Sequence, residues 1–369
     1  MRSPIALKKP AFSALLRNST LAARVAHIRQ VAPGELGLAR KRVGGRFHYL
    51  ASSGRRVTNA RQLARIASLA IPPAWQKVWI CATADGHVQA TGEDARGRKQ
   101  YRYHPAWRSV RDGAKYAEVV AFGNALPRLR EQLACDLAQR SLCRPKVVAA
   151  VISIMQLTSI RVGNDAYASS NGSYGLTTLL NRHVRIQGSR LSLNFRGKGG
   201  KTQLIQVRDR KLAGIARQCR ELPGSRLFQY RAADGKPRGV TASDVNRYLR
   251  DATGAPFTAK EFRTWHGTLH AAWHLANCEP GTSKASAKRA IKAAVEVASA
   301  HLGNTAAICR KSYVHPAVLE AFLDGGLKRE LGSYLSRAKR SAPDGLTPEE
   351  WAVLAWLERR TSQALEKCA

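Results

Sequence analysis

The chain has 369 residues, of which 61 are Lys or Arg and 25 are Asp or Glu, so its formal net charge at pH 7 is +36. No stretch approaches the ~20 consecutive apolar residues of a membrane-spanning helix, so we expect no membrane partner. The positive charge runs through segments of ordinary globular composition, which favours a polyanionic partner such as nucleic acid. Charge alone leaves open a passive binder or a merely solvated basic surface.

Seven cysteines are scattered along the chain, at positions 81, 135, 143, 219, 278, 309 and 368. None are spaced as Cys-x-x-Cys, so neither a zinc ribbon nor a thioredoxin-type motif is predicted. The odd number and the scatter are typical of reduced thiols in a cytoplasm. Residues 1–30 carry Arg2, Lys8 and Lys9 and lack the apolar run of a signal peptide. We therefore expect a basic, partly disordered arm on a cytoplasmic protein.

Residues 31–106 are expected to form a small β-rich domain. Asn59 to Leu69 has apolar residues at helical spacing and ends ahead of Pro72 and Pro73. Three short β-prone runs are bounded by turn residues, at 46–50, 79–82 and 87–91.

The stretch from Asp94 to Pro105 interleaves cations with polar aromatic residues. Its candidates for contact with DNA are Arg98, Gln100, Tyr101 and Tyr103. Cations bind phosphates, while rings and amides meet sugars or base edges, so the pattern favours DNA contact. An exposed strand with an ordinary charged face is the alternative.

Beyond Trp107 the chain is mostly helical, and we assign residues 107–369 to a second domain. Helices are predicted from Tyr116 to about Leu137 and from Pro145 to Ile160, the latter apolar nearly all round and therefore buried. Arg161 follows this buried helix directly. A guanidinium there is rigidly placed and always charged, although it could simply cap the helix end.

Three strands are predicted next, at residues 183–187, 190–195 and 203–207. Lys198 lies in the glycine-rich connection between the second and the third. A phosphate-binding P-loop ending at Thr202 is excluded, because Phe195 stands where that motif needs glycine and a strand follows.

A helix from Thr258 to Asn277 carries Arg263 and three histidines at positions 266, 270 and 274. A zinc-hydrolase motif would need Glu where Gly267 stands, so we favour core or DNA-facing histidines over metal ligands. Near the C-terminus, a capping box from Thr347 to Glu350 predicts a last helix with an apolar stripe.

A helix from Ser286 to Leu302 is expected to end at Gly303, and Asn304 or Thr305 then caps a short helix that Pro316 terminates. Tyr313 lies on this short helix. Taken alone, the segment favours a packing tyrosine near surface charge.

The combination of Arg161, Lys198, Arg263 and Tyr313 favours attack on a phosphodiester. A phenol is a poor nucleophile at its usual pKa near ~10, but neighbouring cations favour the phenolate. Arginines can stabilise negative charge on the phosphate oxygens, and a lysine can protonate the departing 5′ oxygen. The sequence has no acidic cluster for two magnesium ions and no P-loop, so we expect neither a required metal nor a nucleotide cofactor.

Several motifs, in this order, resemble those of the type IB DNA topoisomerases, in the bacterial and poxvirus-like branch. The resemblance covers about residues 40–330 and lies in residues 71–75, 89–92, 97–101, 161–167, 171–179, 195–201, 262–268 and 302–316. It implies an α+β fold in which a small N-terminal β-sheet domain and a mostly helical catalytic domain, with a three-stranded β-hairpin element, form a C-shaped clamp on double-stranded DNA. The implied protein is a monomer that works on the nucleoid.

The resemblance also implies roles for individual residues. Tyr313 would form a 3′-phosphotyrosyl bond, Arg161 and Arg263 would stabilise the transition state, and Lys198 would be the general acid. Asn304 would contact a phosphate oxygen; many relatives have histidine there, and an amide can donate a hydrogen bond but cannot carry a proton. The predicted DNA contacts are Arg98, Gln100, Tyr101, Tyr103, Asn164, Tyr167, Tyr174, Lys201 and His266.

Two alternative functions remain at this point. A tyrosine recombinase shares the fold and the chemistry but would be expected to carry another DNA-binding region in place of the small sheet domain. A catalytically inert DNA-binding clamp would not need all four of Arg161, Lys198, Arg263 and Tyr313.

Overall fold

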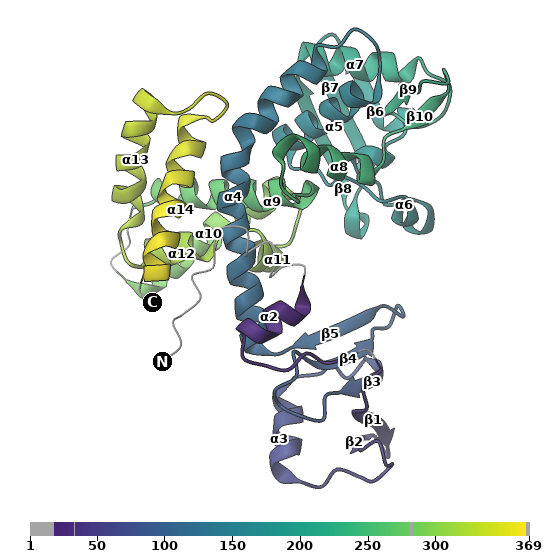
Figure 1. Cartoon of the computed structure of the whole chain (residues 1–369), viewed down its shortest axis with the longest axis vertical. Coiled ribbons are helices and arrows are strands. Elements are labelled where there is room, and N and C mark those ends of the chain that lie inside the picture. Colours follow the sequence, from purple (N-terminus) through teal and green to yellow (C-terminus); the bar gives the residue numbers. More distant parts are fainter. Residues whose placement is uncertain (1–17, 33, 280–282, 367–369) are drawn as a thin grey trace. The chain divides into compact units, whose positions relative to one another are not determined.

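The computed structural model describes residues 18–32, 34–279 and 283–366 of the chain (Figure 1). The backbone divides into two compact units, Met1–Glu118 and Val119–Ala369. The N-terminal arm expected over residues 1–30 lies outside the described residues as far as residue 17, and helix α2 (Ser19–Val25) follows. Within the described part of the chain, no helix is long and apolar enough to cross a membrane.

The first unit is built on an antiparallel sheet with the strand order β2-β1-β3-β4-β5. Its strands are β1 (Leu38–Val43), β2 (Arg46–Leu50), β3 (Gln76–Ile80), β4 (Val88–Glu93) and β5 (Lys99–Tyr103). Helix α3 (Ala60–Ser68) begins at Asn59, whose side chain accepts from the backbone N–H of Gln62, and it buries Ile66 against the sheet. The predicted N-terminal β-sheet and the helix between its strands are thus confirmed.

The second unit is mostly helical and contains a small three-stranded sheet. Its helices are α4 (Pro105–Leu137, which begins in the first unit), α5 (Arg144–Thr158), α6 (Asp165–Asn171), α7 (Arg210–Arg220), α8 (Ala242–Thr253), α9 (Ala259–Ala276), α10 (Lys284–Leu302), α11 (Ala306–Ser312), α12 (Pro316–Leu323), α13 (Leu327–Ser341) and α14 (Pro348–Glu366). Its strands are β6 (Val184–Gln187), β7 (Arg190–Arg196), β8 (Thr202–Arg208), β9 (Gln229–Arg231) and β10 (Pro237–Gly239). The α+β class is therefore confirmed.

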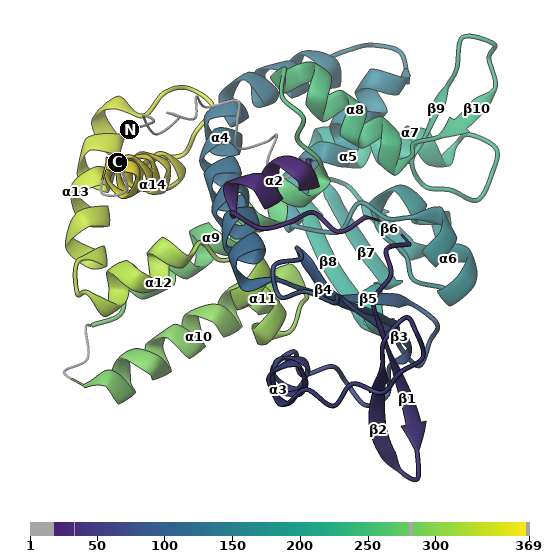
Figure 2. The ribbon, with the colours of Figure 1, turned by 60° about the horizontal axis from the view of Figure 1, so that its bottom comes forward.

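Helix α9 is the central helix of this unit, because it packs against six other helices, namely α5, α8, α10, α12, α13 and α14. Its buried residues include Phe262 and Trp265. Farther along, Leu275 shares a core with Leu331 and Trp356 of the hairpin of α13 and α14, which Figure 2 shows as two neighbouring helices. A capping box between Thr258 and Glu261 starts the helix. A side chain on α9 is therefore held rigidly.

The three-stranded sheet has the order β6-β7-β8 and is antiparallel, as predicted. The glycine-rich connection between β7 and β8 is a short 3₁₀ turn, Lys198–Gly200, in which Gly199 and Gly200 have φ angles of 75° and 78°. L-residues avoid this region, so the connection needs its glycines. Lys198 is thereby placed at the tip.

Two features differ from the sequence-based expectation. Helix α4 begins at Pro105, well before Tyr116, and runs without a break through Pro127. Helices α6, α7, α8, α12 and α13 and the hairpin of β9 and β10 were not predicted. Helices α6 and α12 are short, with seven and eight residues. Helices α7, α8 and α13 do bury apolar residues at helical spacing, such as Val245 and Leu249 in α8, so the sequence held a signal for them that was not used.

Candidate active site

Arg161 is positioned by the end of α5. Ser159 terminates this helix in the left-handed region, with φ 56°, although it is not glycine. The carbonyl of Arg161 then accepts a hydrogen bond from the backbone N–H of Leu176 at 2.9 Å. Gly163 and Gly175 allow the two loops to meet, because a Cβ on Gly175 would lie 2.5 Å from the Cα of Gly163.

The guanidinium of Arg161 faces the loop that follows α10. It donates to the carbonyl of Gly303 at 3.5 Å and to Oδ1 of Asn304. Burial, with the nearby charge of Arg263, lowers the pKa of Arg161 to about 10, which still leaves it charged at neutral pH. A charged, partly desolvated arginine of this kind is suited to stabilising an anion.

Arg263 is almost fully buried, with 4% of its surface exposed, on the central helix α9. One Nη donates to the carbonyl of Ser159 and the other to the carbonyl of Leu302 at 2.7 Å. Its Nε is buried without a hydrogen-bond partner among the described residues. Two helix ends, those of α5 and α10, therefore fix its orientation, and one donor is left unused.

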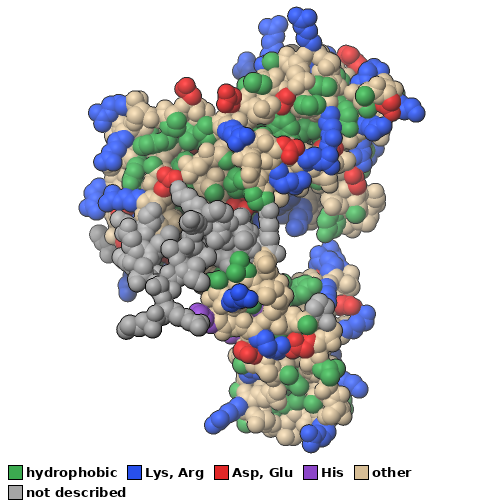
Figure 3. Space-filling model, in the orientation of Figure 1, with side chains coloured by type: hydrophobic (Ala, Val, Ile, Leu, Met, Phe, Trp, Pro, Cys, Tyr) green, Lys and Arg blue, Asp and Glu red, His purple; other side chains and the backbone are tan. Residues whose placement is uncertain are grey.

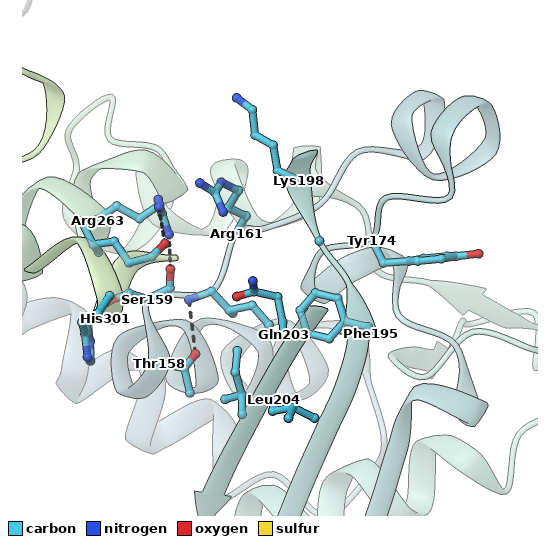
Figure 4. A pocket seen from close by; sticks show the side chains of 15 residues that line it. Thr158, Ser159, Arg161, Tyr174, Phe195, Lys198, Gln203, Leu204, Arg263 and His301 are labelled. Atoms are coloured by element: carbon cyan, nitrogen blue, oxygen red, sulfur yellow. Dashed lines mark hydrogen bonds between the residues drawn. The ribbon is translucent and has the colours of Figure 1, made fainter. Parts of the chain in front are cut away.

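A pocket of about 150 Å³ collects the three cations (Figure 4). Its described lining includes Arg161, Lys198 and Arg263 and contains no Asp or Glu. Lys198 lines it from the hairpin tip, and in Figure 4 its side chain extends away from the two arginines; its ammonium makes no hydrogen bond or ion pair with the described residues. Such a pocket favours an anion over a cation.

Tyr313 lies at the end of α11, where its backbone N–H donates to the carbonyl of Cys309 at 2.8 Å. Its ring packs against the core, and Cζ of Arg263 lies 5.1 Å from the ring centroid. Tyr313 is not among the residues that line the pocket, so Arg263 is the side chain that joins the two. The ring of Tyr313 is thus a packing group, as the segment alone suggested, and its hydroxyl is still available for chemistry.

Asn304 sits between these groups. Its Oδ1 accepts from Arg161, while its Nδ2 is buried and has no partner among the described residues. A buried N–H without an acceptor is costly, and a ligand or a water molecule can supply the acceptor. Thr305, the alternative cap, is the residue that caps α11, so the side chain of Asn304 is left for the site.

His266 is buried, with 9% of its surface exposed, which favours the core interpretation over a contact with DNA. Its Nδ1 lies 2.5 Å from Oγ of Ser159. Burial, with smaller contributions from His301 and His270, lowers the pKa of His266 to about 3. The neutral ring thus pins Ser159, whose carbonyl orients Arg263. Within the described ranges, no group of three or more His, Cys, Asp or Glu residues is arranged to hold a metal ion.

The predicted DNA contacts of the first unit lie on β5 and the turn before it. Asp94 binds Arg98 in an ion pair of 2.7 Å and accepts from Nε2 of Gln100 at 2.9 Å. The hydrogen bond from Arg98 lowers the pKa of Asp94 to about 2. The ring of Tyr101 is 45% exposed and stacks at 5.7 Å on Tyr103, whose burial raises its pKa. Tyr101 is thus the accessible ring, and Tyr103 supports it.

The predicted DNA contacts of the second unit are spread over two segments. Oδ1 of Asn164 caps α6, on which Tyr167 is 62% exposed. Tyr174 packs edge-on against His183 at 4.5 Å and points away from the arginine pair in Figure 4. Lys201 is exposed just after the hairpin tip.

Sequence reasoning missed Ser159 as part of the site. Its carbonyl accepts from Arg263 and its hydroxyl is hydrogen-bonded to His266, both on α9. Nothing in the sequence marks a serine that ends a helix in the left-handed region. The position directly before a candidate catalytic segment was the one available signal.

Comparison with known proteins gives a consistent family. A family described as "Eukaryotic DNA topoisomerase I, catalytic core" matches residues 104–331, and one described as "Bacterial DNA topoisomerase IB, N-terminal domain" matches residues 46–94. A protein of Acanthamoeba polyphaga mimivirus named "DNA topoisomerase 1B" is 29% identical over 293 residues, which cover 78% of this chain and 87% of that protein. The chain belongs to the type IB DNA topoisomerase family.

Proposed function

We propose that this protein relaxes supercoiled duplex DNA through a transient single-strand break. The observation that carries the proposal is the pocket with three cations and no acid in its described lining. Beside it, Nε of Arg263 and Nδ2 of Asn304 are buried donors without partners among the described residues. A phosphodiester supplies the acceptors that these donors lack, and membership of the family supports the type of reaction.

The proposed reaction is an exchange of one phosphate ester for another. The phenol of Tyr313 gives its proton to solvent, and its oxygen forms a bond to the scissile phosphorus while the bond to the 5′ oxygen breaks. Lys198 gives a proton to that departing oxygen, and the DNA keeps its 3′ phosphate on the tyrosine. The free 5′-hydroxyl end can rotate and then attack the phosphotyrosyl ester, which restores the strand and the phenol.

Positive charge is placed where the transition state needs it. Arg161 and Arg263 are held by carbonyls of the chain, so they lose little freedom when the phosphate binds. They would stabilise charge on the non-bridging oxygens, and Nδ2 of Asn304 would add one neutral hydrogen bond. Arg263 also lies over the ring of Tyr313, where it would stabilise charge that develops on the phenol.

The DNA contacts come from both units. Figure 3 shows Lys and Arg side chains spread over the visible surface and far fewer acidic ones, as the net charge of +36 requires. We assign phosphate or base contacts to Arg98, Gln100, Tyr101, Asn164, Tyr167 and Lys201. His266 is left out because it is buried.

The proposed enzyme acts as a monomer in the cytoplasm on nucleoid DNA. The exchange conserves ester bonds, so it consumes no nucleotide. The three cations supply the charge that a divalent cation provides in other phosphoryl-transfer sites, so the reaction requires no metal, although a divalent cation can still stimulate it.

The test is relaxation of negatively supercoiled plasmid in EDTA without ATP. We expect relaxation by the wild type and none by Tyr313→Phe at matched concentration. Absence of relaxation by the wild type would contradict the function, and activity in Tyr313→Phe would contradict the choice of nucleophile. Recombined products from two plasmids would favour a tyrosine recombinase instead.

A further inference from the structure

The backbone of α9 lies unusually close to the backbone of Tyr313. A Cβ on Gly267 would lie 2.7 Å from the carbonyl oxygen of Tyr313, 3.0 Å from its Cβ and 3.1 Å from Cδ1 of Leu302. Real Cβ atoms essentially never approach another atom more closely than 3.0 Å. Gly267 is therefore needed for this contact, and its φ angle plays no part because it lies inside a regular helix.

The next residue along α9 ties the same segment by hydrogen bonds. Thr268 is fully buried, and its hydroxyl donates to the carbonyl of Tyr313 at 3.3 Å and accepts from the backbone N–H of His315 at 3.1 Å. One hydroxyl thus binds the peptide groups on both sides of Val314. Together with the bond to Cys309, this fixes the backbone of Tyr313 on its N–H and its carbonyl.

The same helix carries Arg263, four residues before Gly267. Residues four apart lie on the same face of a helix, so the arginine and the point of backbone contact face Tyr313 together. The 5.1 Å separation of Cζ of Arg263 from the tyrosine ring follows from this arrangement. Any change in the spacing between α9 and Tyr313 alters the aim of the phenol relative to the pocket that Arg263 lines.

We propose that Gly267 and Thr268 form a seat for the nucleophile. They are positioning residues: neither touches the phosphate, and each acts through the backbone of Tyr313. The proposal rests on the proposed function, since it takes Tyr313 as the nucleophile, and it adds the determinant of where the phenol points.

The expected effect follows from the contact. To reach an ordinary separation of 3.4 Å from the carbonyl oxygen, a methyl group on Gly267 must displace it by about 0.7 Å. A displacement near 1 Å at a reacting group can cost ~10²-fold in rate, so we expect Gly267→Ala to slow strand cleavage by about 10- to 100-fold. Thr268→Val keeps the shape but removes the hydroxyl, and about 10-fold is expected from two lost hydrogen bonds. Thr268→Ser should recover most of the wild-type rate.

The experiment measures single-turnover cleavage of two duplexes by saturating full-length enzyme. One duplex has the natural 5′ oxygen as leaving group and the other has sulfur at that bridging position. Thiolate leaves without a proton, so a defect in the general acid is rescued by sulfur, whereas a misplaced nucleophile is not. Lys198→Ala is the reference for rescue. Gly332→Ala is the matched control, because Gly332 is also a helical glycine and nothing lies within 4 Å of the added methyl.

We expect Gly267→Ala and Thr268→Val to be slow on both duplexes, with DNA affinity as in Gly332→Ala. Their thermal midpoints should fall, because the added methyl group is crowded and the lost hydroxyl leaves buried partners, so the rates are measured at a temperature at which each variant is fully folded. Three results would overturn the proposal. They are wild-type rates in both variants, rescue of either variant by sulfur, and a loss of rate that follows a loss of folded protein. If Gly267→Ala does not fold, the pair Thr268→Val and Thr268→Ser decides. With both variants fully folded at the assay temperature, the proposal requires slow cleavage of both duplexes by Thr268→Val and recovery in Thr268→Ser, and equal rates would overturn it. A wild type that cleaves neither duplex refutes the proposed function itself, which is a distinct result.

Discussion

The unpaired amide of Asn304 gives the sharpest prediction about the chemistry. Asn304→Asp is nearly isosteric, but it replaces the buried Nδ2–H donor by an acceptor and puts negative charge beside Arg161. In the free protein the new carboxylate pairs with Arg161, and the unpaired N–H, which costs about 1–3 kcal/mol, is gone. We therefore expect the folded protein to be more stable by an amount of that order.

The same substitution should slow cleavage severely. A unit charge 4 Å from the phosphate at an effective dielectric constant near 20 contributes about 4 kcal/mol of repulsion, which corresponds to about 10³-fold in rate. Asn304→Ala removes one neutral hydrogen bond, worth about 0.5–1.5 kcal/mol, and should cost only about 2- to 10-fold. Asn304→His restores a donor and should stay near the wild type.

The assay is single-turnover formation of the covalent complex on a nicked or truncated duplex, combined with denaturant unfolding of each variant. The reasoning fails if Asn304→Asp cleaves within a few-fold of the wild type, because the amide would then not face the phosphate. It also fails if Asn304→Ala is as slow as Arg161→Ala. A more stable but much slower Asn304→Asp variant is the result expected if the N–H of Asn304 is left unpaired in the free protein in order to bind the substrate.

Three further predictions concern the cations, the buried histidine and the surface charge. Arg161→Ala and Arg263→Ala should each slow cleavage by about 10²–10³-fold and Lys198→Ala by about 10²–10⁴-fold; losses below 10-fold in the same single-turnover assay would contradict their roles. Burial lowers the pKa of His266 to about 3, so the neutral ring stabilises the fold above the unfolded pKa near 6.5, and this stabilisation is lost as the pH falls toward 3. Between pH 7 and pH 4 the free energy of unfolding should therefore fall less steeply in His266→Gln than in the wild type. Parallel curves for the two proteins would refute this. DNA affinity in filter binding should drop by about 10³-fold or more between 50 and 200 mM salt if six or more phosphates are contacted, and a flat profile would speak against phosphate contacts.

The parts of the site that regular patterns encode could be predicted from the sequence. The helix predicted from Thr258 to Asn277 is α9, and Gly303 marked the end of α10. These boundaries placed Arg263 on a helix and Asn304 in a loop. The glycines after Lys198 likewise marked the tip of a hairpin.

The rest depends on contacts between segments that are distant along the chain. The orientation of Arg263 comes from the carbonyls of Ser159 and Leu302, which are 104 and 39 residues away. A backbone carbonyl carries no signal in a sequence, and neither does the buried position of His266. The close approach of Gly267 to Tyr313 is likewise invisible, because a glycine in a helix looks like a weak point until its neighbour is known.

The central claim is that Tyr313 becomes joined to a 3′ phosphate of DNA. The direct measurement is to trap the covalent complex, digest the DNA and the protein, and determine by mass spectrometry which peptide carries the nucleotide. Trypsin should release Tyr313 within the peptide Ser312–Lys328, which contains no other tyrosine. The account predicts a 3′-linked nucleotide on Tyr313 of this peptide. A nucleotide on another peptide, a 5′ linkage, or no covalent complex at all would contradict it.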